Sequence, residues 1–313
     1  MRVAFFGTPE TAVPTLDALL RHGVDVALVV TRADRPVGRS RTPRPPAVKV
    51  RAGEVGLPVV QPESVKDPAF AAALEAAAPD ALVVVAYGRL LPQGVLDAAP
   101  HGAINVHFSM LPALRGAAPV AWALARGARE TGVSTFRLDR GLDTGDVLLQ
   151  EAVPILPREH APALLARLAV TGAELLVRTL DGLAAGTIVP HPQDGARATY
   201  APILTRGDGA WDPGWTAADL EGRVRGFDPW PGVWSRCAGR RLRLAGAVAL
   251  DGDLSDAPAG TLLDALRLAC ADGTVAALEA VQFEGRRVVT AREAAAGRQL
   301  APGDRLERIE PAA

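Results

Sequence analysis

The stretch DALVVVAYGRLLPQGVLDAAPHGAINVHF, from Asp80 to Phe108, contains two short apolar runs, one at each end. The runs DALVVVA and AINVHF do not alternate regularly between polar and apolar positions. Such runs are typical of strands that are buried on both faces, as in a parallel sheet. Three more of them occur earlier in the chain, at RVAFFG (Arg2 to Gly7), DVALVVT (Asp25 to Thr31) and LPVVQ (Leu57 to Gln61).

Amphipathic segments lie between these runs. TAVPTLDALLRHG and DPAFAAALEAAAP are expected to form helices, and the second should begin at an Asp-Pro cap and end before Pro79. Alternating strands and helices predict an α/β fold with a doubly wound, mostly parallel sheet of the Rossmann-like kind.

The pattern changes in the second half of the chain. A long helix is expected over residues 162–185, followed by the Gly-, Pro- and polar-rich stretch GTIVPHPQDGARATYAP. Beyond it, closely spaced runs without intervening helices predict a small antiparallel β-barrel of the OB-like kind. We therefore expect a first domain over 1–188 with an insertion loop at 32–49, a linker over 189–204 and a barrel over 205–313.

Composition limits the possible functions. The 313 residues suit two domains, and 49% hydrophobic residues exclude a disordered chain. A formal net charge of -1 gives no overall positive field, so any RNA contact must come from a local patch. Cys237 and Cys270 lack the spacing of a zinc or redox motif and are expected to be reduced packing thiols. The sequence shows neither a signal peptide nor a bilayer-spanning stretch, which predicts a cytoplasmic protein with no membrane partner.

Two polar residues interrupt the run AINVHF. Asn105 and His107 are two positions apart, so they project from the same face of the expected strand. They lie near its carboxyl end, the edge at which open parallel sheets bind ligands. A polar pair alone is more often a capped strand end whose polar groups are satisfied. Burying it costs free energy unless something pairs with it.

Two neighbouring segments favour a site. LRGAAP supplies Arg115 and a Gly-Ala turn that lets backbone N–H groups approach a bound group. GLDTGD presents Asp143 in a tight loop between two glycines. The spacing of an EF-hand is absent, so we predict no metal site.

An amide, an imidazole and a carboxylate without a suitable Ser or Cys nucleophile suit acyl transfer between two bound substrates. Asn105 can donate a hydrogen bond to a carbonyl oxygen that becomes tetrahedral. His107 would add a second donor if cationic, and we expect Asp143 to raise its pKa and fix its orientation. Asp143 can accept the proton that the attacking amine loses, directly or through a water molecule.

The motifs INVHFSMLPALRG and GLDTGDVL resemble those of the 10-formyltetrahydrofolate-dependent formyltransferases. VAFFGTPE, RADRPVGRS, VVAYGRLLP, ATYAPILT and VRGFDPWPGVW extend the resemblance over nearly the whole chain, towards the branch that acts on methionyl initiator tRNA. The resemblance implies that Asn105, His107 and Asp143 are the catalytic trio.

The resemblance also implies where the formyl donor binds. The folate would be held by the stretch Ser109, Met110, Leu111 and Pro112, and its pterin would lie against Tyr87, Gly88, Arg89, Leu90 and Leu91 and the loop before Asp143. Several positions depart from the family pattern, among them the following three. Phe108 stands where the family has Gly, Met110 replaces the first Leu of S-L-L-P, and Thr11 replaces a Phe expected to contact the methionyl side chain.

The insertion TRADRPVGRSRTPRPPAVK, from Thr31 to Lys49, contains six cations, one anion and four prolines. From composition alone, a solvated surface loop and an RNA-binding loop are equally supported. The expected position at the carboxyl edge favours an extended loop that neutralises phosphates. In the resembled family this insertion contacts the tRNA acceptor arm, so we expect tRNA binding by Arg35, Arg39, Arg41 and Arg44.

The resemblance implies an enzyme that transfers a formyl group from 10-formyltetrahydrofolate to methionyl initiator tRNA, for translation initiation, and we expect a monomer. An enzyme that formylates a sugar nucleotide is the main alternative. A noncatalytic RNA- or folate-binding protein and a formyltetrahydrofolate hydrolase are the others.

Overall fold

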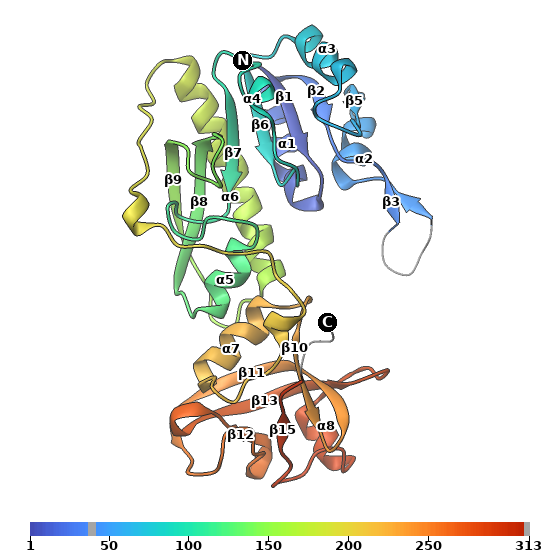
Figure 1. Cartoon of the computed structure of the whole chain (residues 1–313), viewed down its shortest axis with the longest axis vertical. Helices are drawn as coiled ribbons and strands as arrows, with labels where there is room; N and C mark the ends of the chain where they lie inside the picture. Colours follow the sequence, from blue (N-terminus) through green and yellow to red (C-terminus); the bar gives the residue numbers. More distant parts are fainter. Residues whose placement is uncertain (37–41, 310–313) are drawn as a thin grey trace. The chain divides into compact units, whose positions relative to one another are not determined.

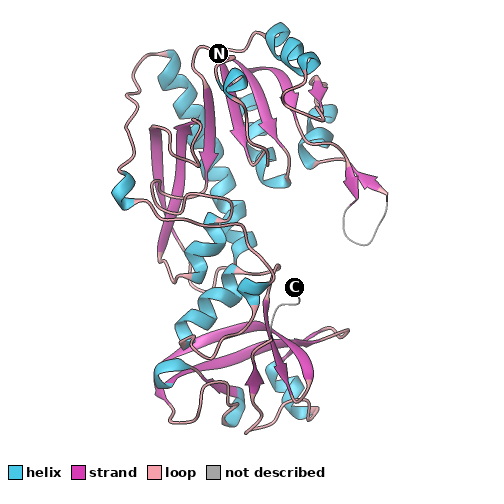
Figure 2. Ribbon diagram, viewed as in Figure 1, coloured by secondary structure: helices cyan, strands magenta, loops and turns pink. Residues whose placement is uncertain are grey.

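The computed structural model describes residues 1–36 and 42–309, which belong to two compact units (Figures 1 and 2). The first unit comprises Met1–Gly116, Glu130–Pro154 and Leu165–Tyr200. The second comprises Ala117–Arg129, Ile155–Leu164 and Ala201–Ala313. Each unit is therefore assembled from segments that are separated in the sequence.

The first unit is built on a seven-stranded sheet with the order β5-β2-β1-β6-β7-β8-β9. Its strands are β1 (Arg2–Gly7), β2 (Asp25–Val30), β5 (Val59–Val60), β6 (Ala81–Val85), β7 (Ala103–His107), β8 (Glu130–Arg137) and β9 (Val147–Pro154). Neighbouring strands in the series β5-β2-β1-β6-β7 are parallel. Strand β8 pairs antiparallel with β7, and β9 pairs antiparallel with β8. The prediction of a doubly wound, mostly parallel sheet is confirmed.

Helices cover both faces of this sheet. They are α1 (Val13–Arg21), α2 (Ala47–Glu54), α3 (Pro68–Ala77), α4 (Gln93–Leu96) and α6 (Ala161–Ala184), the last from Leu165 onward. On one face Phe6 and Val84 pack with Phe70 of α3 and Val95 of α4. On the other, the Thr135 hydroxyl meets Thr179 of α6 at 2.8 Å. The apolar runs form buried strands because both of their faces meet helices.

The predicted insertion loop has more secondary structure than its composition suggests. Strand β3 (Arg35–Pro36) pairs with β4 (Pro43–Arg44), and α2 already begins at Ala47. Lys49 on this helix forms an ion pair with Asp34 at 2.8 Å. Arg39 and Arg41 lie outside the described residues.

The second unit contains an antiparallel sheet with the order β12-β13-β11-β10-β15, and β14 also pairs with β13. These strands are β10 (Val233–Cys237), β11 (Arg240–Leu254), β12 (Arg267–Ala269), β13 (Thr274–Phe283), β14 (Val288–Thr290) and β15 (Leu306–Glu307). Bridges between Leu262 and Leu268 and between Thr261 and Arg305 link β12 back towards β15. The sheet thus closes on itself, as a barrel prediction requires.

Three helices, α5 (Pro119–Ala125), α7 (Ala217–Gly226) and α8 (Ala291–Ala296), complete the second unit. Thr216 and Asp219 form a capping box that fixes the start of α7. Gly226 lets α7 approach α5, because a Cβ there would overlap the carbonyl oxygen of Ala121.

Both cysteines are buried and free. Burial raises the pKa of the Cys237 thiol to about 11 and that of Cys270 to about 12. Thiols with such pKa values remain protonated near neutral pH, which suits packing rather than nucleophilic catalysis.

Among the helices in the described part of the chain, none combines the length and the apolar character needed to cross a bilayer.

Candidate active site

Strand β7 carries Asn105 and His107 between two different neighbours. Asn105 pairs in register with Val84 of β6 and with Phe136 of β8, and His107 pairs with Ser134 of β8. Directly opposed residues in a sheet share a face, so Asn105, His107 and Ser134 lie on the same side. Helix α6 covers the opposite side, where Thr135 bonds to it. The carboxyl end of β7 therefore presents polar side chains on the face away from α6.

Asp143 lies in the loop between β8 and β9. Hydrogen bonds from the loop's own residues to the Asp139 side chain hold this loop together. The Asp139 carboxylate accepts hydrogen bonds from Gly141 N–H at 2.9 Å and from the Thr144 hydroxyl at 2.7 and 2.8 Å. Gly145 is required by a close approach, because a Cβ there would overlap the carbonyl oxygen of Arg137. Asp143 itself has a φ of 53°, a left-handed conformation that is uncommon for residues with a side chain.

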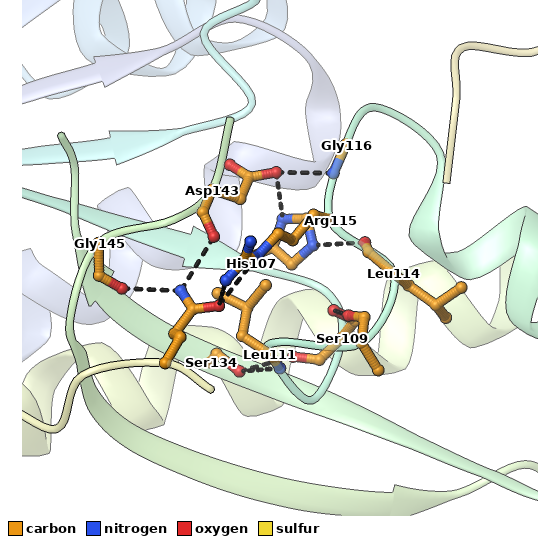
Figure 3. A network of polar contacts seen from close by, with 11 residues as sticks. His107, Ser109, Leu111, Leu114, Arg115, Gly116, Ser134, Asp143 and Gly145 are labelled. Carbon is orange, nitrogen blue, oxygen red and sulfur yellow. Dashed lines mark hydrogen bonds and ion pairs between the residues drawn. The ribbon is translucent and has the colours of Figure 1, made fainter. Parts of the chain in front are cut away.

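His107 and Asp143 lie next to each other at the carboxyl end of β7 (Figure 3). The distance from His107 Nδ1 to Asp143 Oδ2 is 3.7 Å. The same Oδ2 accepts a hydrogen bond from Gly116 N–H at 2.7 Å. His107 Nε2 lies 3.0 Å from the Leu114 carbonyl oxygen. Because a carbonyl oxygen can only accept, Nε2 carries the proton, and neutral His107 has its lone pair on Nδ1.

The pKa of His107 is set by opposing influences. Burial of the imidazole lowers its pKa below the ordinary value of 6.5, and this effect outweighs Asp143 and the Leu114 carbonyl, both of which raise it. The expected influence of Asp143 is therefore present but smaller than the desolvation of the ring. A lowered pKa favours the neutral imidazole over the cation that would add a second donor.

Gln193 is a residue of this site that the sequence did not reveal. Its side-chain N–H groups donate to the backbone oxygens of Asp143 at 2.9 Å and Gly145 at 2.7 Å. Its side-chain oxygen accepts from Arg115 Nε at 3.1 Å and Nη2 at 2.8 Å. Gln193 belongs to an irregular polar segment without periodicity, so only its position in space identifies it.

The turn from Ser109 to Pro112 is held by internal hydrogen bonds. The buried Ser109 hydroxyl donates to the Ala113 carbonyl oxygen at 2.6 Å. The Ser134 hydroxyl donates to the Ser109 carbonyl oxygen at 2.7 Å and accepts from Leu111 N–H at 3.0 Å. The Ser109 hydroxyl is thus already engaged within the turn, and the segment is a rigid support beside His107.

The segment from Tyr87 to Leu91 follows β6 at the same carboxyl edge. Tyr87 is buried against Phe6, with ring centroids 5.5 Å apart, and burial raises the pKa of its hydroxyl. In the described residues that hydroxyl has no hydrogen-bond partner. The Arg89 guanidinium donates to the carbonyl oxygens of Pro62 and Glu63, whereas Leu90 is 87% exposed. The segment thus combines a buried tyrosine with an exposed apolar side chain.

Two departures from the family motif face the interior. Phe108 is buried, and a Cβ at Gly172 of α6 would lie 3.6 Å from its ring. The Met110 side chain is so close to Gly132 of β8 that a Cβ there would overlap its sulfur. The Phe108 ring therefore packs on the α6 side of the sheet, opposite to Asn105 and His107.

Of the four arginines expected to bind tRNA, the structure describes two. Arg35 and Arg44 are exposed and stand directly opposite each other in the β3–β4 hairpin. Like charges in this arrangement repel, so the hairpin concentrates positive charge.

The site holds no obvious place for a metal ion. Within residues 1–36 and 42–309, no three His, Cys, Asp or Glu side chains are grouped to bind one. Asn105, His107 and Asp143 supply an amide, an imidazole and a carboxylate near the carboxyl end of β7.

The chain belongs to the formyl transferase family. Residues 1–180 match the formyl transferase family, and residues 206–299 match the formyl transferase C-terminal domain. The methionyl-tRNA formyltransferase of Acidobacterium capsulatum is 48% identical over 98% of this chain and 99% of its own. That of Anaeromyxobacter sp. strain K is 49% identical over 95% of this chain and 97% of its own.

Solved structures of low identity share the fold. The N-formyltransferase from Helicobacter canadensis, in complex with folinic acid and dTDP-3-aminofucose, matches with a TM-score of 0.67 at 16% identity. It covers 88% of this chain and 98% of its own. The methionyl-tRNA formyltransferase from Clostridium thermocellum matches with a TM-score of 0.54 at 13% identity, covering 80% of this chain and 95% of its own.

Proposed function

We propose that this protein transfers the formyl group of 10-formyltetrahydrofolate to the free amino group of methionyl initiator tRNA, as a cytoplasmic monomer. Relatives that are 48% and 49% identical over nearly their whole length bear the name methionyl-tRNA formyltransferase. A neighbour in fold was solved with folinic acid. Formylation removes a charged amine and so creates a distinct signal for translation initiation.

The reaction exchanges one carbon–nitrogen bond for another. The amine nitrogen attacks the formyl carbon, and the bond between that carbon and N10 of the folate breaks. The amine loses a proton and N10 gains one. The Asn105 carboxamide donates a hydrogen bond to the formyl oxygen as the carbon becomes tetrahedral. Asp143 and His107 together accept the proton of the amine.

The environment of His107 is the observation that carries this mechanism. Neutral His107 has an unprotonated Nδ1 that faces Asp143 Oδ2 at 3.7 Å, so two basic atoms stand next to each other. An imidazolium formed during the reaction would have acceptors at both nitrogens, namely Asp143 and the Leu114 carbonyl oxygen. In the described residues no group donates to Asp143 Oδ1, which leaves that oxygen available to the amine.

The folate fits the segments that flank this cluster. A pterin is flat, and the residues from Tyr87 to Leu91 offer exposed apolar surface at Leu90. The turn from Ser109 to Pro112 would support the donor through backbone and apolar contacts, since the Ser109 hydroxyl is engaged. When bound, the folate supplies the formyl group and the leaving nitrogen.

Arginine-rich surfaces in both units suit the RNA acceptor. Arg35 and Arg44 supply positive charge in the hairpin, and we propose that Arg39 and Arg41 add to it. In the second unit, two cavities that share Phe283, Arg286 and Gln299 are lined by further arginines, Arg240, Arg241 and Arg287. We propose that residues 1–188 form the catalytic domain, 189–204 a linker and 205–313 the barrel. The barrel and the insertion would bind the RNA.

The decisive experiment offers one labelled donor to several acceptors. The protein is incubated with 10-formyltetrahydrofolate carrying a labelled formyl group and with methionyl initiator tRNA, methionyl elongator tRNA or a dTDP-amino sugar. Label should enter the initiator tRNA. Release of labelled formate without any acceptor would instead identify a hydrolase, and binding without release or transfer would identify a noncatalytic protein.

Formylation of a sugar nucleotide is the second candidate, because the fold neighbour from Helicobacter canadensis was solved with dTDP-3-aminofucose. The arginine hairpin separates the two. Replacing Arg35 and Arg44 should weaken the use of tRNA, whereas an enzyme for a small sugar nucleotide would be unaffected.

A further inference from the structure

One amide side chain joins the two loops that build the active site. Gln193 binds the loop of Asp143 through its N–H groups and the loop after β7 through Arg115. It lies between the regions that match the two family domains, 1–180 and 206–299.

The contacts of Gln193 require a carboxamide. Such a group has two N–H donors and one oxygen with two lone pairs, and here all four are used. Both donors bind backbone oxygens of the loop, at 2.9 and 2.7 Å, and the oxygen binds Arg115, at 3.1 and 2.8 Å. A carboxylate of the same shape could retain only the contact to Arg115, because it has no hydrogen to donate.

The loop contacts act on a strained position. Asp143 has a φ of 53°, a conformation that a residue with a side chain adopts only when its surroundings hold it there. Gln193 holds the carbonyl oxygen of this same residue. Fixing that peptide group fixes the direction of the side chain, whose Oδ2 meets Gly116 N–H and faces His107.

The segment that carries Gln193 is itself tied to both loops. His191 and Val147 exchange two backbone hydrogen bonds, at 2.9 and 2.8 Å, just beyond the Asp143 loop. Arg115 N–H donates to the Thr199 carbonyl oxygen at 2.8 Å. The Arg115 side chain is buried, so its guanidinium cannot move freely to another partner. The position of the Gln193 amide is thus determined from three directions.

We infer that Gln193 is a positioning residue that holds the Asp143 carboxylate against His107. This role rests on the proposed function for its effect on catalysis, whereas the geometry that it predicts can be measured without any substrate.

The test compares two substitutions that differ in one property. Gln193→Leu removes all four hydrogen bonds, and Gln193→Glu keeps the bond to Arg115 but loses both donations to the loop. We expect both to lower kcat on the order of 100-fold, as misplacement of a reacting group does, with KM unchanged for both substrates. If Gln193 served only to anchor Arg115, Gln193→Glu would retain the wild-type kcat, and the inference would be overturned.

Asp194→Ala is the matched control. Asp194 caps the next turn by accepting from Ala196 N–H at 3.0 Å, so this variant disturbs the same segment without touching the Gln193 amide. It should retain the wild-type kcat. An equal loss in Asp194→Ala would show that only the fold of the segment matters.

A second measurement keeps the inference independent of activity. Asp143 raises the pKa of His107, so a carboxylate that moves away should let this pKa fall further in Gln193→Leu. Imidazole NMR titration of the intact, ligand-free protein reports it. An unchanged His107 pKa in Gln193→Leu would contradict the positioning role, whether or not the wild type transfers formyl groups. If the pKa falls in Gln193→Leu but the wild type is inactive, only the proposed function is contradicted.

Discussion

The cluster around His107 and the arginine surfaces use polar side chains in opposite ways. In the cluster, His107 is buried and bonded to Leu114, and Asp143 is bonded to Gly116, so each contact has one geometry. In the hairpin, Arg35 and Arg44 are exposed and oppose each other. The cluster therefore depends on the directions of its hydrogen bonds, whereas the arginines of the hairpin contribute positive charge.

This difference separates two kinds of effect. A buried hydrogen bond depends closely on the distance and direction between its donor and acceptor. Where such a bond stabilises the transition state, its loss should lower kcat. Exposed charges attract phosphates over a Debye length and are screened by salt, so their loss should appear in affinity. The predictions below test this division, from the largest expected effect to the smallest.

Asn105→Ala should have the largest effect on rate. Loss of one hydrogen-bond donor to a developing oxyanion typically lowers kcat by about 100- to 1,000-fold, while substrate binding persists. Asn105 is the only asparagine in the sequence, so selective ¹⁵N labelling yields a single side-chain amide. Its signal should shift when a folate that carries a formyl group binds. An unshifted amide together with an active Asn105→Ala variant would remove Asn105 from the mechanism.

Asp143→Asn should lower kcat by about 100-fold, because the variant keeps an acceptor for Gly116 but loses the basic oxygen. The charge of Asp143 raises the pKa of His107, so its removal should lower that pKa further below 6.5. Titration of the imidazole by NMR measures the direction. A rise in the pKa of His107 would mean that the cluster is not organised as described.

The double replacement Arg35→Ala and Arg44→Ala should raise KM for tRNA by about 10-fold and leave kcat nearly unchanged. The dependence of binding on salt should weaken by roughly one unit of slope for each phosphate that is no longer neutralised. Lys66→Ala, which removes an exposed cation outside the insertion, is the control and should behave as wild type. A fall in kcat for the double variant would place the hairpin in the chemical step.

Phe108→Ala should have the smallest effect on rate and a clear effect on stability. The buried ring packs beside Gly172, and its removal leaves a cavity that costs about 3 kcal/mol of unfolding free energy. Denaturant unfolding measures the loss. Because the ring lies on the side of the sheet opposite His107, kcat of the folded variant should stay close to that of the wild type. A large change in KM for the folate would instead link Phe108 to the donor site.

Much of the fold could be predicted because its signals are local. The apolar run AINVHF predicts a strand, and a spacing of two predicts that Asn105 and His107 share a face, since side chains alternate along any strand. The two glycines beside Asp143 predict a tight loop for the same local reason. Gln193 carries no comparable signal, because an amide in an irregular polar segment reads the same whether it meets solvent or a catalytic loop.

The sequence by itself determined the five parallel strands of the first unit with helices α1, α3 and α6, the closely spaced strands of the second unit, and the residue types available at the carboxyl edge of β7. These follow from backbone periodicity, which depends on neighbours along the chain. Only the tertiary structure decided that burial lowers the pKa of His107, that Gln193 joins two loops, and that Phe108 packs away from the site. Burial and hydrogen bonding between distant segments set those properties, and both arise only when the chain has packed.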